Sequence, residues 1–131
     1  MKFILMMNGP KAGVDTFVQW PIEALQAHVA FMREFVKSLK EEGSYVAAEG
    51  LAFPHEAKIV RAGADGLPVT DGVFPESKEF LMGYWIVDVE NPEQAYRIAA
   101  RASVAPGPGG VPLYIPIEVR QVMSSAPKEW Q

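Results

Sequence analysis

The chain has 131 residues, of which 49% are hydrophobic and 21% are charged, and this balance predicts one folded domain rather than a disordered segment. It contains no cysteine, which excludes disulfides, thiolate metal sites and cysteine nucleophiles. The net charge of −4 leaves no basic surplus for a phosphate backbone or an anionic lipid surface, so we expect neither nucleic acid nor a membrane as a partner.

We expect no export or membrane-spanning segment. The apolar run at residues 3–7 is too short for the core of a signal peptide, and the run at 80–87 is far below the roughly twenty residues of a membrane helix. A cytoplasmic protein is therefore predicted. One domain is expected over residues 1–125, followed by a C-terminal tail over residues 126–131.

The first expected element is a strand over residues 2–8, whose apolar character on both faces predicts that both are covered. The Asn-Gly-Pro sequence at 8–10 is predicted to end it, and residues 11–20 to form a loop. A helix follows from Pro21, because apolar residues then recur every three to four positions, and Gly43 suits the residue just after its end.

The middle of the chain predicts strands. One is expected over residues 45–51, and a hairpin is expected to be inserted over residues 57–70. Residues 80–89 are typical of a long apolar strand, in which Gly83 indicates a bulge or a close approach of two backbones.

The last third predicts a second helix and a final strand. Asn91 can cap the helix, Pro92 suits its first position, and Gln94 can complete a capping box. A loop rich in Pro and Gly over residues 105–112 then leads to a strand over residues 114–123.

This order of elements predicts an α+β fold of the ferredoxin-like split βαβ type with an inserted hairpin. Two helices cover one face of such a sheet. Because the strands at residues 3–7 and 80–87 are apolar on both faces, the second face also needs a cover. In a chain of this size we expect that cover to be a second copy, and so a homodimer.

Residues 70–84 (TDGVFPESKEFLMGY) resemble the signature of the DGPF family within the YCII-related proteins. In that signature a DGPF turn precedes an E-(T/S)-K-E run and a strand with Gly before an aromatic residue. Val73 stands where the family has Pro, and Pro75 follows two positions later. The resemblance implies a dimeric α+β barrel. Weaker matches lie at residues 2–7, 47–51 and 118–120.

The resemblance also supplies two candidate catalytic residues. In YCII-like proteins an Asp at this turn and a His on the first helix are candidate catalytic groups, and here these types occur at Asp71 and His28. A carboxylate in contact with an imidazole would orient it for acid–base work. The plainer interpretation makes Asp71 a turn residue that caps its own backbone, and His28 a half-buried packing residue.

We expect a cleft for a small organic ligand between the sheet and the helices. The candidate ligand contacts are Met6, Met32, Tyr84, Trp85, Glu76, Lys78 and Arg61. Among them Arg61 would hold an anionic group through paired hydrogen bonds, although core packing and solvated surface ion pairs are the commoner roles of such residues. No cofactor motif occurs, and two histidines without cysteine make a metal site improbable, so we expect neither a cofactor nor a metal.

Two functions therefore stay open. The first is a small cofactor-free enzyme in which Asp71 and His28 act as an acid–base pair. The second is a non-catalytic ligand-binding or regulatory module, which the resemblance suggests because DGPF-like proteins are associated with extracytoplasmic-function sigma factors. A hydrogen bond between His28 and Asp71 would favour catalysis, whereas wide separation would favour binding.

Overall fold

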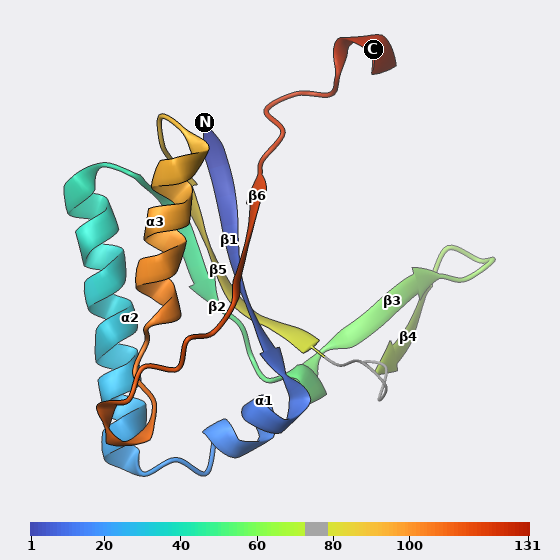
Figure 1. Cartoon of the computed structure of the whole chain (residues 1–131). Coiled ribbons are helices and arrows are strands. Elements are labelled where there is room, and N and C mark those ends of the chain that lie inside the picture. The colour runs from blue at the N-terminus through green and yellow to red at the C-terminus, as the bar shows by residue number, and fades with distance from the viewer. Residues whose placement is uncertain (73–78) are drawn as a thin grey trace.

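A four-stranded antiparallel sheet forms the centre of the computed structural model, which describes residues 1–72 and 79–131. The strand order is β2-β5-β1-β6, with β1 at Lys2–Pro10, β2 at Tyr45–Gly50, β5 at Glu79–Asp88 and β6 at Ile117–Gln121. Two helices, α2 (Ile22–Glu42) and α3 (Pro92–Ser103), lie side by side on one face of it (Figure 1). This arrangement is compatible with the predicted ferredoxin-like α+β fold. Within the described part of one chain the sheet is open at β2 and β6, so it is not a closed barrel.

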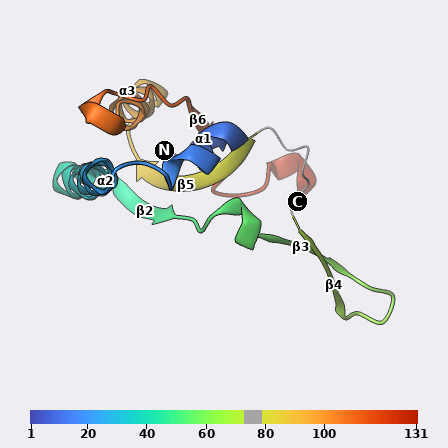
Figure 2. The same ribbon diagram turned by 90° about the horizontal axis from the view of Figure 1, so that it is seen from below.

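A separate two-stranded sheet confirms the inserted hairpin. It consists of β3 (Lys58–Ala62) and β4 (Pro68–Gly72), and it projects away from the four-stranded sheet and the helices (Figure 1). Figure 2 shows the same projection from below. The turn between the two strands is closed by a 2.7 Å hydrogen bond from the Gly63 N–H to the Leu67 carbonyl. Gly66 has a φ of 81° there, a conformation that glycine adopts without strain.

The place of Asp71 in this hairpin differs from the sequence prediction. Asp71 and Gly72 are the last two residues of β4 rather than a turn, and Asp71 pairs with Ile59 across the hairpin. The turn of the hairpin lies at residues 63–67, in the middle of the predicted hairpin, where Gly63 and Gly66 favour a turn. Residues 73–78 of the DGPF-like segment lie outside the described residues, and residues 79–84 of it belong to β5.

The N-terminal segment also differs from expectation. β1 continues to Pro10, with an irregular register between Met7 and Asn8, instead of ending at Asn8. A short helix, α1 (Lys11–Phe17), then stands where a loop is predicted. It has no side-chain cap at its N-terminus and no buried residue. Neither a capping residue nor an apolar periodicity therefore predicts this helix from the sequence.

The two long helices follow their predictions. α2 ends at Gly43, which has a φ of 79° and whose N–H bonds to the carbonyls of Leu39 and Lys40. α3 is capped by Asn91, whose Oδ1 accepts a 2.9 Å hydrogen bond from the Gln94 N–H. No helix in the described ranges is long and apolar enough to span a bilayer.

The hydrophobic core fills the space between these helices and one face of the sheet. The Phe35 ring of α2 lies 5.4 Å from the Trp85 ring of β5. The opposite face presents Ile4 and Met6 of β1 beside Ile86 and Tyr84 of β5, all only partly buried, and neither long helix covers it. Buried core residues include Phe3, Leu5, Met7, Phe35, Leu39, Trp85, Val87, Ala95, Ile98, Ala99 and Ala102.

Candidate functional site

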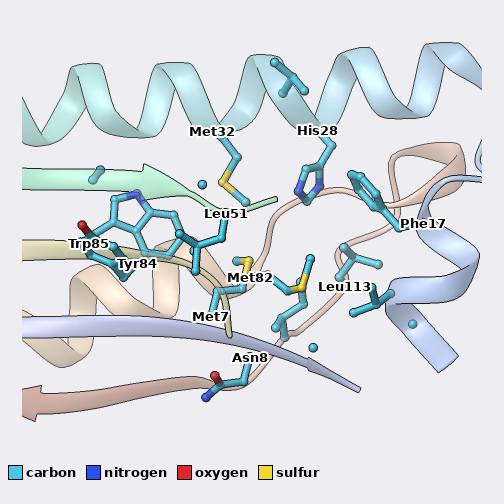
Figure 3. Close-up of a pocket in the computed structure, with 18 of the residues that line it drawn as sticks. Met7, Asn8, Phe17, His28, Met32, Leu51, Met82, Tyr84, Trp85 and Leu113 are labelled. Atoms are coloured by element: carbon cyan, nitrogen blue, oxygen red, sulfur yellow. The ribbon is translucent and has the colours of Figure 1, made fainter. Parts of the chain in front are cut away.

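A pocket of about 1250 Å³ lies beside α2, where α1, the ends of β1, β2 and β5, and the loop after α3 meet. Apolar side chains make up most of its walls (Figure 3). A concave apolar space with a few polar groups is the usual form of a small-molecule site. Its apolar lining includes Met7, Phe17, Trp20, Met32, Leu51, Met82, Trp85 and Leu113.

His28 is the histidine of this pocket, and it points from α2 toward the other walls (Figure 3). Two aromatic rings meet its imidazole edge to face. The Phe17 ring centroid lies 5.5 Å away at an interplanar angle of 72°, and the Trp20 centroid lies 5.7 Å away at 79°. Such contacts hold an imidazole in place by packing, so α1 and the turn after it position the side chain.

A backbone carbonyl fixes the tautomer of His28. Its Nδ1 lies 3.0 Å from the oxygen of Pro106, in the loop after α3. A carbonyl oxygen only accepts hydrogen bonds, so we assign the proton to Nδ1, and the neutral ring then carries its lone pair on Nε2. In the described ranges Nε2 has no hydrogen-bond partner, and no unsatisfied side-chain nitrogen is fully buried. The lone pair is therefore accessible to a ligand.

Two glycines, Gly83 and Gly50, lie where the backbones of β5 and β2 approach each other closely at the border of the pocket. A Cβ atom added at Gly83 of β5 would lie 3.0 Å from the Glu49 carbonyl oxygen of β2, which is too close for an ordinary contact. This confirms the predicted close approach of two backbones. Gly83 and Gly50 are cross-strand partners, and both border the pocket.

The candidate ligand contacts fall into three groups. Met32, Tyr84 and Trp85 border the pocket. Met6 does not border it, although its register partner Tyr84 does, and the next residue along β1, Met7, borders the pocket instead. Arg61 is exposed on β3 and is not part of the lining, whereas residues 76 and 78 lie outside the described residues.

The two candidate catalytic residues are not brought together. Asp71 is exposed on β4 and is absent from the described lining of the pocket. No hydrogen bond links it to His28 in the parts of the chain that the structure describes; Pro106 is the partner of His28 there. The other histidine, His55, is exposed and stacks on Phe53 at 6.2 Å. No group of potential metal ligands occurs within residues 1–72 and 79–131.

Three residues at the centre of the site were not predicted, for two reasons. Phe17 and Trp20 belong to a segment without apolar periodicity, so the sequence predicts a loop there. Pro106 contributes only its carbonyl, a group that every residue has, and so no sequence signal marks it. The unassigned aromatic residues of the 11–20 segment are the one available signal.

The sequence matches a known family model over most of its length. The model is that of the YCII-related domain, and it matches residues 1–111, which include His28 and Pro106 but not β6. No curated protein matches the chain.

Proposed function

The chain belongs to the YCII-related domain family, and we propose that it binds a small organic molecule in the pocket beside His28. The observation that carries the proposal is an apolar pocket with one oriented imidazole, whose Nε2 is accessible. Burial of apolar ligand surface supplies most of the affinity, and a hydrogen bond to Nε2 fixes the orientation of the ligand.

Phenylnaphthylamine is a suitable probe, because it is uncharged and apolar, carries one N–H donor and fluoresces on leaving water. We expect saturable binding to the wild type.

His28→Asn keeps a donor near Nδ1 but removes the acceptor at Nε2. It should weaken binding about fivefold, as expected for one neutral hydrogen bond. His28→Gln, which keeps an acceptor, and His55→Gln, which alters the exposed histidine, stay within about twofold of wild type. The absence of saturable binding, or equal weakening by His55→Gln, contradicts the proposal.

Catalysis without a cofactor is the second candidate, and the hydrogen bond from Nδ1 to Pro106 favours it. With Nδ1 protonated, Nε2 can take a proton from a bound substrate, and the imidazolium can return that proton in a later step. In this role the carbonyl of Pro106 performs the orienting task that the sequence assigns to Asp71.

The elimination of nitrobenzisoxazole tests this base directly. The base removes the ring C–H proton, the C–H electron pair becomes part of a nitrile, and the N–O pair leaves on oxygen as a phenolate. We expect a rate that saturates with substrate, with a loss of at least about tenfold in His28→Gln and none in His55→Gln. Equal rates in the two variants indicate a pocket that binds without catalysing.

The non-catalytic alternative has its own support, because no carboxylate in the described ranges forms a hydrogen bond or ion pair with His28. An oriented imidazole without an acidic partner suits recognition as well as catalysis. A regulatory role linked to extracytoplasmic-function sigma factors, and membership of the DGPF subgroup, stay predictions from the resemblance of residues 70–84.

We also propose that a second copy covers the open face of the sheet, as the sequence predicts. The partly exposed Ile4 and Ile86 support this, since they lie opposite each other on the face that lacks helices. Glu118 and Arg120 of β6 share that face, as the partners of Met6 and Ile4 in the register. A twofold axis makes such a patch contact its own copy, so opposite charges at its border are compatible with self-association.

A further inference from the structure

We propose that the ligand of this pocket is an organic anion, with an apolar body and one acidic group such as a carboxylate or sulfonate. This inference rests on the proposed binding function and adds the chemical class of the ligand. It comes from the charged residues at the border of the pocket, which are three basic residues, Arg33, Lys37 and Lys40, and one acidic residue, Glu49.

The charge of the pocket is opposite to that of the whole chain. The chain has 16 acidic and 12 basic residues, and its net charge is −4. A random sample of its surface is therefore acidic, whereas the described pocket lining is cationic. Cations concentrated beside an apolar cavity attract anions more strongly than the same cations on a flat surface, because the low-dielectric wall reduces screening.

Arg33 and Lys37 are the two cations available to a ligand. They are four residues apart on α2, so their side chains are neighbours on one face of the helix. Neither forms an ion pair in the ranges that the structure describes, where the recorded pairs are Met1 with Asp88 and Arg101 with Glu42. Lys40 is already engaged, since its Nζ lies 4.9 Å from the centre of the Tyr45 ring.

The spacing along α2 sets a minimum length for the ligand. With a rise of 1.5 Å per residue, Arg33 lies about 7.5 Å and Lys37 about 13.5 Å along the helix axis from His28, and both also lie more than a third of a turn around the helix from it. Met32 and Val36 border the pocket between these points. An apolar body that reaches from the imidazole to the cations is therefore expected, with the acidic group beside Arg33 and Lys37 and a donor group beside Nε2.

Two matched probes separate this inference from the binding function. The first probe is the anilinonaphthalene sulfonate whose sulfonate and amine lie at opposite ends of the naphthalene. It shares the aromatic rings and the amine with phenylnaphthylamine, and only the sulfonate carries an acidic group. We expect the wild type to bind the sulfonate about threefold to tenfold more tightly. Raising the salt concentration from about 0.05 M to about 0.5 M should remove most of this advantage, since the added ions screen exposed charges.

The double substitution Arg33→Gln/Lys37→Gln should abolish the preference for the sulfonate, and it should weaken sulfonate binding far more than phenylnaphthylamine binding. Arg97→Gln/Lys128→Gln removes the same charge outside the pocket lining and should preserve the preference. Binding of both probes with equal affinity overturns the assignment of an anion and leaves the binding function standing. Binding of neither probe overturns the proposed function itself.

Discussion

The four-stranded sheet with its helices and the β3–β4 hairpin are built in opposite ways. In the first, Leu5, Leu39 and Val87 are fully buried between sheet and helices. In the second, Val60, Leu67 and Val69 are between 55% and 63% exposed, and among the described residues the two strands pair with each other and with no other strand. A two-stranded hairpin has little stability of its own, so the packing that fixes the position of a side chain comes from the first region.

This difference separates the two candidate catalytic residues. His28 is held by two aromatic rings and a hydrogen bond to a backbone carbonyl. Asp71 lies on the hairpin and is exposed. A functional group needs a fixed position, and in this structure the imidazole has one.

The same substitution in the two regions should have very different effects on stability. Leu39→Ala removes a fully buried side chain and should lower the free energy of unfolding by about 2–5 kcal/mol. Leu67→Ala, in the turn of the hairpin, should change it by less than about 0.5 kcal/mol. Urea unfolding at one protein concentration measures both, and equal losses would show that the hairpin is packed in solution.

A charge on the open face should break the proposed dimer. Ile86→Asp places a carboxylate in the interface and should weaken association by about a hundredfold, because the buried charge has no partner. Ile22→Asp, at the exposed start of α2, is the matched control and should leave association unchanged. Sedimentation measures the change. A wild type that is monomeric at micromolar concentration contradicts the proposed dimer.

A finer comparison uses the two glycines that pair across β2 and β5. Gly83→Ala should cost about 1–3 kcal/mol, because the new Cβ lies 3.0 Å from a backbone oxygen that has little freedom to move. Gly50→Ala should cost little or nothing, since no atom of its described surroundings lies within 4 Å of its Cβ position. Thermal unfolding of the two variants should give clearly different midpoints.

The smallest effect is expected on the hairpin. Asp71→Asn should change the affinity for phenylnaphthylamine by less than about twofold, because Asp71 does not border the pocket. Fluorescence titration measures it. A loss as large as that of His28→Asn would mean that the hairpin of a neighbouring copy reaches the pocket, and the acid–base pair predicted from the sequence would then be restored.

The fold was largely predictable because its signals are local. The apolar spacing of α2, its end at Gly43 and the cap at Asn91 each depend on a few neighbouring residues.

The site was less predictable because its parts come from distant segments. His28 was found through the family resemblance, but its partner is a carbonyl 78 residues away, and the choice of Met7 over Met6 depends on which strand face the helices cover.

Methyl NMR of the methionines tests the central claim, that the pocket beside His28 is the binding site. The chain has six methionines, of which Met7, Met32 and Met82 border the pocket, while Met6 and Met123 do not. On addition of phenylnaphthylamine we predict that the methyl signals of Met7, Met32 and Met82 shift and that those of Met6 and Met123 do not. Shifts led by Met6, on the opposite face of the sheet, or spread evenly over all five signals would contradict it.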